Sequence, residues 1–398
     1  MQRGFARKRG GTWTAYFYVN DGVKRRQRSK AGFRTKAAAL GYLNETIAAL
    51  QKGELVEPIK VTFGDYLLER WLSTVEHQLR PSTWDSYHRM IRLHVVPTLG
   101  AIPLQQLTAE HFDRLYARLL NSGRLRDGTG LSPKTVRYLH NTLRKALHDA
   151  ERKQLVTRNV AQAADPPKVR QGGNREMKTW TAEQLRDFLL ATEGHRMYVA
   201  FVLAATTGMR RGEVLGVRWQ DVDLVARRLA VRQTVLTLNY AVSFGTPKTA
   251  RGRRLIALDG STVAVLQAHR RRQLEERAVA EAYHDHDLVL ARPDGEPVHP
   301  DYFSQCFDRT VARLGMPRIR LHDLRHTHAT LGLAAGLQPK VISDRLGHAT
   351  VAFTQDIYVH AIPRLEEEAA EKVGDLIWGT NGSGDVNDSG DGGKRPKH

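Results

Sequence analysis

The sequence predicts a multidomain chain: a small β-sheet plus helix, then an all-α domain, then a larger mixed α+β domain that is mostly helical. Three observations support this order. Apolar and polar residues alternate over 13–19, helical apolar stripes fill the sequence from Thr62, and strand-like runs stand between helices beyond the Pro/Gly-rich linker 165–176. We expect domains at 1–56, 62–165 and 175–375, followed by a disordered Gly/Ser/Asp-rich tail, 376–398.

The first part is predicted as two strands and a helix. WTAYFYV at 13–19 alternates as a strand, NDG is a turn, and VKRRQRS at 23–29 is a second, very basic strand. Thr35 can cap a helix whose apolar face comprises Leu40, Leu43, Ile47 and Leu50. A basic sheet can enter a DNA major groove. The predicted DNA contacts of this sheet are Lys24, Arg25, Arg26, Arg28 and Lys30.

The middle part is predicted as helices that pack through apolar stripes. Phe63, Leu67 and Trp71 share one face, and the segment LSPKT begins the last helix with Ser132 as its cap and Pro133 in its first turn. We assign these stripes to core packing and not to chemistry.

The last part is predicted to begin with helices in TAEQLRDFLLAT and MYVAFVLAATTG, and to continue with strand-like runs RRLAVRQTVL, YAVSF and RRLIAL before further helices. A Gly208 turn leads into a helix with Arg210 near its start and Glu213 on the same face, a pair that a simple salt bridge would explain equally well. Lys248 is expected in a hairpin between two strands.

Charge and cysteine content indicate the kind of partner. The 398 residues carry a net charge of +19, and residues 1–60 hold 13 Lys and Arg against 4 Asp and Glu. Nucleic acid is therefore favoured over the alternative of a merely basic soluble protein. A single cysteine, Cys306, excludes an internal disulfide and suggests a reducing, cytoplasmic location. Neither a membrane span nor a secretory signal is expected.

A histidine cluster stands in LHDLRHTHAT, 321–330. On a helix, His322 and Arg325 would face one ligand, whereas His322 and His326 have the spacing of a zinc pair. No Glu in the zincin arrangement and no further ligand accompanies them, so phosphate is favoured over metal, and no metal or other cofactor is expected. His326 and His328 are expected to pack rather than to react.

Six separated side chains together match what cleavage of a phosphodiester without metal requires. Two arginines can grip phosphate oxygens, a lysine can protonate a leaving oxygen, and histidines can hydrogen-bond the phosphate or accept a proton. A tyrosine can attack once it is positioned and deprotonated. The set is Arg210, Lys248, His322, Arg325, His348 and Tyr358.

These segments also resemble a known family. TGMRRGEVLGVRW, TPKT, HDLRHTHAT and LGHATVAFT, with the tyrosine that follows, resemble in order the motifs of tyrosine site-specific recombinases of the phage integrase type. STWDSYHRMIRLHVVPTLGAIPLQQLT is similar to the family's SAM-like core-binding domain, and residues 1–56 are similar to its arm-site module. The resemblance implies an integrase that cleaves and rejoins DNA for a prophage or another mobile element.

The resemblance also implies residue roles. Arg210 and Arg325 would hold the scissile phosphate, with Glu213 supporting the first of them. Lys248 would protonate the 5′-hydroxyl leaving group, His322 would assist as acid/base, and His348 would orient the phosphate. Tyr358 would attack to form a 3′-phosphotyrosyl bond. Tyr358 follows His348 by 10 residues, one more than is common in the family.

The implied partners are double-stranded DNA at core and arm attachment sites, a homotetramer on that DNA, a host DNA-bending protein and an excision factor, in the nucleoid of a bacterial host. Three alternatives remain, of which a housekeeping dimer-resolving recombinase is disfavoured by the arm-site module. A type IB topoisomerase-like relaxing enzyme shares the chemistry but needs no arm module. A catalytically silent DNA-binding regulator would be expected to have a damaged catalytic set.

Overall fold

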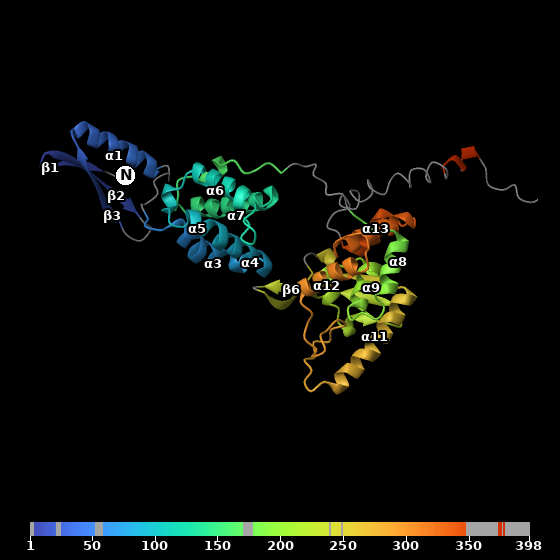
Figure 1. Cartoon of the computed structure of the whole chain (residues 1–398). Helices are drawn as coiled ribbons and strands as arrows, with labels where there is room; N and C mark the ends of the chain where they lie inside the picture. Colours follow the sequence, from blue (N-terminus) through green and yellow to red (C-terminus); the bar gives the residue numbers. More distant parts are fainter. Residues whose placement is uncertain are drawn as a thin grey trace, which may run out of the picture. The chain divides into compact units, whose positions relative to one another are not determined.

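The structure is a computed structural model that describes residues 4–20, 25–51, 59–169, 178–238, 240–247, 250–347, 373–375 and 377–378. The chain divides into two compact units, Met1–Gly173 and Asn174–His398 (Figure 1). Nearly all of the tail for which disorder is predicted, 376–398, lies outside the described residues. In the described parts of the chain, no helix has the length and apolar character needed to cross a membrane.

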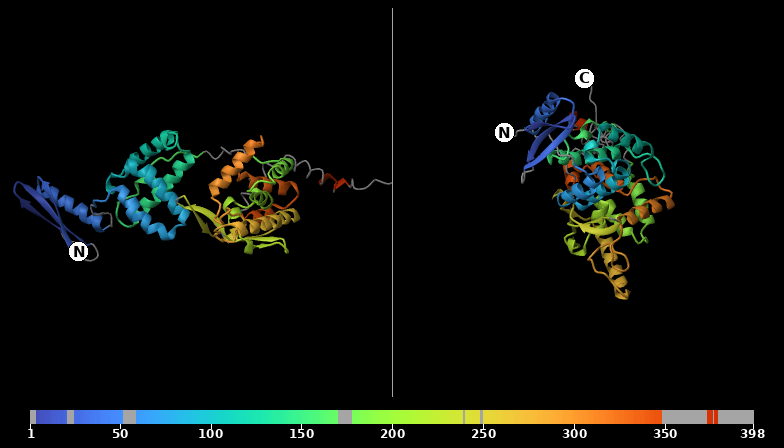
Figure 2. Two further views of the ribbon diagram at one scale, coloured as in Figure 1. Left: turned by 60° about the horizontal axis from the view of Figure 1, so that its bottom comes forward. Right: turned by 90° about the vertical axis from the view of Figure 1, so that its left-hand side faces the viewer.

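The amino-terminal module has three strands and not the two that the sequence predicts. β1 (Phe5–Arg9), β2 (Thr12–Asn20) and β3 (Arg25–Phe33) pair in antiparallel order β1-β2-β3. β1 was missed because its sequence, FARKR, has too few apolar residues to alternate visibly. α1 (Lys36–Gln51) lies along one face of the sheet (Figure 2). The amide of Ala38 donates to Thr35 Oγ1 at 3.1 Å, so the predicted cap is confirmed.

The small core between this sheet and α1 only partly follows the predicted helix stripe. Ala15 and Phe17 of β2 pack against Ala39 and Leu43 of α1. Leu40 was expected on the buried face but is 41% exposed, because the helix buries Ala39 in its place. The side chain of Leu50 lies outside the described part of the chain.

Residues 59–169 contain only helical elements apart from one isolated bridge. These elements are α2 (Phe63–Asp65), η1 (Tyr66–Trp71), α3 (Leu72–Val75), η2 (Glu76–Gln78), α4 (Pro81–Met90), η3 (Ile91–Val95), α5 (Val96–Leu99), η4 (Leu104–Gln106), α6 (Ala109–Ser122), α7 (Pro133–Arg152) and η5 (Val160–Ala163). The predicted stripe of Phe63, Leu67 and Trp71 is fully buried in one core. Ser132 caps α7 by accepting from the Thr135 amide at 3.2 Å, as predicted.

In its described residues, the second unit combines helices with two small antiparallel sheets. Within residues 178–347, the part of this unit that the structure describes most fully, the helices are α8 (Ala182–Ala191), α9 (Tyr198–Thr207), α10 (Arg211–Leu215), η6 (Trp219–Asp221), η7 (Ala250–Gly252), α11 (Gly260–Val279), α12 (Pro300–Arg313), α13 (Asp323–Ala334) and α14 (Pro339–Leu346). β4 (Val222–Asp223), β5 (Arg228–Val231) and β8 (Arg254–Ala257) form one antiparallel sheet, and β6 (Thr234–Leu238) pairs with β7 (Ala241–Gly245). The predicted fold class is confirmed: a sheet-plus-helix module, an all-α part and a mostly helical α+β part.

The predicted strand-like runs all contain strands, but their pairing differs from the one expected. RRLAVRQTVL forms two strands, β5 and β6, that belong to different sheets. β7 and β8 belong to different sheets, so these two described strands do not pair with each other as the expected hairpin requires. Lys248 itself lies outside the described residues. Strand propensity alone does not determine which strand pairs with which.

α9 forms the centre of this unit. Its residues are buried on nearly every side, and Phe201 packs against Phe188, Phe303 and Phe307 with ring centroids 5.2, 5.8 and 6.0 Å away. Because α9 ends at Thr207, this aromatic cluster fixes where the following Gly208 turn and Arg210 stand.

We predict that Phe201→Ala lowers the free energy of unfolding of the second unit by about 3–5 kcal/mol, because it removes a fully buried ring and leaves a cavity. Urea titration followed by intrinsic fluorescence measures the change. Leu190→Ala is the control, since Leu190 is 64% exposed and its loss should change this energy by less than about 0.5 kcal/mol. Equal effects of the two substitutions would contradict the central role of α9.

Candidate active site

A glycine turn places the first predicted arginine. Gly208 follows α9 with φ +62°, in the left-handed region that favours glycine. A Cβ at this position would stand 2.4 Å from Leu346 Cδ2 and 2.9 Å from His328 Cδ2, so a side chain cannot be accommodated without displacing both. The chain then enters α10 at Arg210, the residue that precedes its first turn.

Arg210 is held by Glu213. Arg210 Nη1 donates to Glu213 Oε1 at 2.8 Å, and the Arg210 amide donates to Oε2 at 3.1 Å. The carboxylate is 3% exposed and also accepts from Arg254 Nη2 at 2.8 Å. Burial alone would raise the pKa of Glu213, but the bonds and charge of Arg254 and Arg210 outweigh burial and lower it. Glu213 is therefore a buried, ionised carboxylate shared between two guanidinium groups.

Arg325, in the first turn of α13, is the most deeply buried of the three arginines, with 4% exposure. It donates from Nη1 to Gly208 O and from Nη2 to Leu346 O, both at 2.7 Å. Burial and the neighbouring positive charge of Arg210 lower the pKa of Arg325 to about 9, which leaves the group cationic at neutral pH. Two like charges are thus held close together, an arrangement that a bound anion would stabilise.

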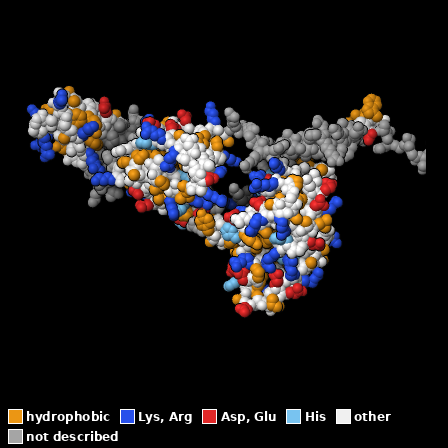
Figure 3. All heavy atoms as spheres, in the orientation of Figure 1, with side chains coloured by type: hydrophobic (Ala, Val, Ile, Leu, Met, Phe, Trp, Pro, Cys, Tyr) orange, Lys and Arg blue, Asp and Glu red, His pale blue; other side chains and the backbone are white. Residues whose placement is uncertain are grey.

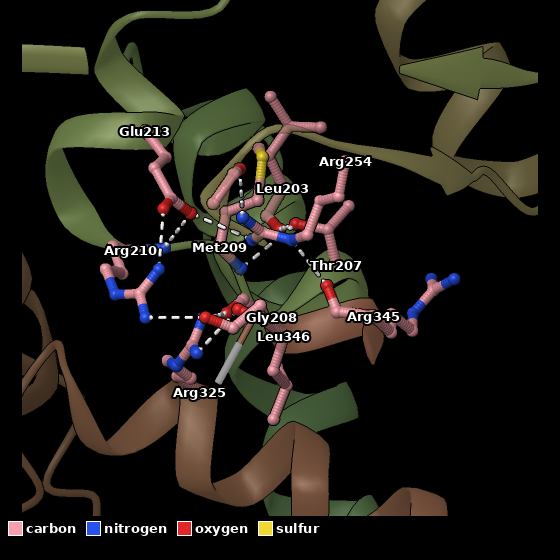
Figure 4. A network of polar contacts seen from close by, with 12 residues as sticks. Leu203, Thr207, Gly208, Met209, Arg210, Glu213, Arg254, Arg325, Arg345 and Leu346 are labelled. Atoms are coloured by element: carbon pink, nitrogen blue, oxygen red, sulfur yellow. Dashed lines mark hydrogen bonds and ion pairs between the residues drawn. The ribbon is translucent and has the colours of Figure 1, made fainter. Parts of the chain in front are cut away.

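The carboxyl end of α14 joins these arginines (Figure 4). Its last carbonyls have no partner within the helix and carry partial negative charge. Gly347, with φ +67°, ends the helix in the left-handed region. Three successive carbonyls accept from three different arginines: Arg345 O from Arg254 Nε at 2.6 Å, Leu346 O from Arg325 Nη2 at 2.7 Å, and Gly347 O from Arg210 Nη2 at 3.0 Å.

The three histidines of the cluster take different positions. His322 directly precedes α13 and is exposed, and its ring meets that of His326 edge-on at a centroid distance of 5.3 Å. Protein atoms that exclude water from part of the ring lower the pKa of His322, and the positive charges of His326 and Arg325 lower it further. His328 is further inside: Nδ1 donates to Ala205 O at 3.0 Å and Nε2 accepts from Arg345 Nε at 3.2 Å. His328 therefore packs between α9 and α14, as expected for a structural role.

The structure brings four of the predicted site residues to one place, around α10 and the start of α13: Arg210, Glu213, His322 and Arg325. The sequence alone did not decide whether Arg210 and Glu213 form a salt bridge, and in the structure they do. Lys248, His348 and Tyr358 lie outside the described residues. Among the residues that the structure describes, no three His, Cys, Asp or Glu side chains form a group able to hold a metal ion.

Sequence reasoning missed Arg254 and Arg345, which complete the arginine network. Arg254 stands among other arginines in RGRR and Arg345 beside an aspartate in DRLGH, and neither local pattern distinguishes a buried arginine from an exposed one. Their contacts bridge 41 residues to Glu213 and 139 residues to Thr206 O, so only the fold reveals them.

The predicted DNA contacts of the amino-terminal sheet lie partly on the side that faces α1. Arg28 and Lys30 are exposed, but the register places them opposite Phe17 and Ala15, and directly opposed residues share a face. Lys30 Nζ lies 4.4 Å from the centre of the Tyr42 ring on α1. Lys24 and the side chains of Arg25 and Arg26 lie outside what the structure describes.

The face of this sheet opposite α1 has basic residues that the prediction did not include. Phe5 and Tyr16 stack there at 4.9 Å, and the exposed Arg7 and Arg9 of β1 share that face by register with Thr14 and Thr12. Figure 3 shows Lys and Arg side chains on this module with few acidic ones beside them on the face in view.

We predict that acid destabilises the second unit through His328. Burial and then Arg345 lower the pKa of His328 to about 4, whereas in the unfolded chain it is about 6.5. Between these values the unfolded state binds the extra proton, so the free energy of unfolding should fall as the pH is lowered from 6.5 to 4. Urea titrations across this range measure the free energy of unfolding at each pH. His328→Asn should make this free energy depend less steeply on pH. His284→Asn is the control and should leave the pH dependence unchanged, because the side chain of His284 is 62% exposed. An unchanged slope in His328→Asn would refute this assignment.

The sequence of the chain is similar to known family models and proteins. The model described as "Phage integrase family" matches residues 175–364, and "Phage integrase, N-terminal SAM-like domain" matches residues 62–120. A "Tyrosine recombinase XerC-like" protein of Caldanaerobacter subterraneus subsp. tengcongensis is 27% identical over 86% of this chain and 90% of its own length.

Two solved structures share the fold. The Tn1549 transposon integrase in complex with circular intermediate DNA superposes with a TM-score of 0.61 at 20% identity, over 79% of this chain and all of that one. A lambda integrase tetramer bound to a Holliday junction gives 0.54 at 18% identity, over 86% of this chain and 92% of that one. The two family models together match more than half of the 398 residues. The chain belongs to the phage integrase family of tyrosine recombinases.

Proposed function

We propose that this protein is a site-specific DNA recombinase, an integrase that cleaves and rejoins duplex DNA through a 3′-phosphotyrosyl intermediate. One observation carries the proposal. Arg210 and Arg325 are fixed to the neighbouring carbonyls Gly347 O and Leu346 O, with their like charges close together. Such a pair is suited to hold the non-bridging oxygens of one phosphate.

Arg210 and Arg325 would bind the phosphate in different ways. The Arg210 side chain is 39% exposed, while Arg325 is buried and uses Nη1 and Nη2 to bind backbone carbonyls. Arg210 would thus reach the phosphate from the open side, and Arg325 would meet it with its remaining N–H groups. Because Glu213 and backbone carbonyls already fix these groups, little reorganisation would be needed as charge develops in the transition state.

The proposed cleavage step is an in-line displacement at phosphorus. The Tyr358 hydroxyl gives its proton to His322 and its oxygen bonds to phosphorus as the bond to the 5′ oxygen breaks, and Lys248 supplies the proton that the leaving oxygen requires. His322 assists proton transfer, and His348 steadies the phosphate. A 5′-hydroxyl from another strand then attacks the phosphotyrosine and releases Tyr358. The covalent bond retains the energy of the broken phosphodiester, so the cycle needs no ATP.

Several partners follow from the proposal. The Tn1549 and lambda relatives were solved with DNA, the latter as a tetramer on a Holliday junction. We propose that this chain likewise acts as a tetramer on core sites, in the nucleoid of a bacterial cytoplasm, with a host DNA-bending protein and an excision factor. The face of the amino-terminal sheet opposite α1, with Arg7 and Arg9, would read the arm sites.

We predict that Tyr358→Phe abolishes covalent protein–DNA adducts, because the attacking oxygen is removed while the DNA-binding surface is kept. The assay incubates the protein with a nicked duplex taken from the DNA that flanks its coding sequence, and resolves adducts by denaturing electrophoresis. Gel-shift affinity should stay within about threefold of wild type. Tyr302→Phe, at an exposed tyrosine of α12, is the matched control and should retain the adduct. Adduct formation by Tyr358→Phe would overturn the assignment.

We predict that the protein does not relax supercoiled plasmid that lacks its attachment site, because an integrase couples cleavage to assembly on specific sites. Agarose gels of plasmids with and without the flanking DNA provide the comparison. Efficient relaxation of the plasmid without the site would instead favour the topoisomerase-like alternative. A protein that binds the flanking DNA but cleaves neither plasmid would favour the silent regulator.

A further inference from the structure

Arg254, the first residue of β8, is the most connected side chain of the arginine network. Each of its three side-chain nitrogens donates to the protein: Nε to Arg345 O at 2.6 Å, Nη1 to Gly252 O at 3.0 Å and Nη2 to Glu213 Oε2 at 2.8 Å. The side chain is 7% exposed. Because its donors point to protein acceptors and its surface is covered, Arg254 is poorly placed to bind DNA itself.

Arg254 contacts both supports of Arg210. Arg210 is held on one side by Glu213 and on the other by Gly347 O. Arg254 binds the second oxygen of the same carboxylate, and it binds Arg345 O, two residues before Gly347. One planar guanidinium thus fixes the relative positions of the two groups that fix Arg210 (Figure 4).

Arg254 also packs directly against the end of α14. A Cβ built on Gly347 would lie 3.1 Å from Arg254 Nη1 and 3.2 Å from its Cδ. Gly347 is the residue immediately before His348. The position of Arg254 therefore constrains the point from which the chain continues toward His348 and Tyr358.

Without Arg254, the buried Glu213 carboxylate would lose one of its two charged partners. Burial disfavours its charged form, and only the cationic donors around it hold its pKa low. A carboxylate with one partner is free to rotate away from Arg210 or to take up a proton. Lysine cannot replace the arginine, because one ammonium lacks the planar fork that reaches three separated acceptors.

We infer that Arg254 is a positioning residue for DNA cleavage: it holds the Glu213 carboxylate and the end of α14 in place, and through them the guanidinium of Arg210. The inference rests on the proposed function, since its consequence is measured on the cleavage step. It assigns to Arg254 no contact with DNA.

The test measures the single-turnover rate of adduct formation, at saturating protein, on the nicked duplex from the flanking DNA. Arg254→Gln and Arg254→Lys should each lower this rate about 10- to 100-fold, because a small misplacement of a phosphate-binding group is costly. Their dissociation constants for the duplex should change less than about threefold. Arg228→Gln is the matched control, an exposed arginine on the neighbouring strand β5, and should react at the wild-type rate.

A second comparison separates positioning from general loss of structure. If Arg254 acts through Arg210, Arg254→Gln should slow an Arg210→Lys protein by much less than it slows the wild type. If the double variant instead loses rate by the product of the two single losses, Arg254 acts independently of Arg210, and the inference is overturned. Thermal unfolding identifies a variant that fails to fold, and Arg254→Lys, which keeps the charge, then provides the decisive rate.

The remaining outcomes are also distinguishable. Absence of adduct from the wild type overturns the proposed function and the inference that depends on it. A wild-type protein that forms the adduct, together with Arg254 variants that form it equally fast, overturns the inference alone.

Discussion

The rest of this site depends on the hydrogen bonds that arginine side chains donate to the carbonyl groups at the carboxyl end of α14. These carbonyls would otherwise be unsatisfied, and the guanidinium groups would repel one another. The arginines satisfy the carbonyls, and the partial negative charge of the carbonyls reduces the repulsion between the arginines. Arg345 O, Leu346 O and Gly347 O each accept from a different arginine. Glu213 adds the one full negative charge and is shared between two of those arginines. The cations are thereby fixed close together before any phosphate is bound.

This arrangement connects distant parts of the sequence to one chemical task. α9 brings Gly208, α10 brings Glu213, β8 brings Arg254 and α13 brings Arg325 to the same helix end. The glycines at 208 and 347 allow the close approach, since a Cβ on either would meet neighbouring atoms at 3 Å or less. Preorganised charge of this kind is the usual source of rate enhancement in phosphoryl transfer. The family membership and the geometry therefore support the same conclusion by independent routes.

Local signals predicted much of this molecule, and long-range contacts account for what was missed. The caps at Thr35 and Ser132 and the stripe of Phe63, Leu67 and Trp71 follow from rules that operate within a few turns, and all are confirmed. Arg210 and Glu213 are three residues apart and were paired correctly. Arg254 reaches Glu213 across 41 residues, and β7 and β8 belong to different sheets, so neither fact was visible in the sequence. Leu40 shows the same limit on a smaller scale, because α1 buries Ala39 against the sheet and leaves Leu40 exposed.

The central claim is that Arg210 and Arg325, held on the end of α14, surround the phosphorus atom at which Tyr358 reacts. A structure of the protein on its attachment-site DNA, with vanadate in place of the scissile phosphate, tests this most directly. The account predicts vanadate oxygens within hydrogen-bond distance of both guanidinium groups and the Tyr358 oxygen on vanadium, supplied by the same subunit or by a neighbouring one. Vanadate bound out of reach of either arginine, or joined to another residue, would contradict it.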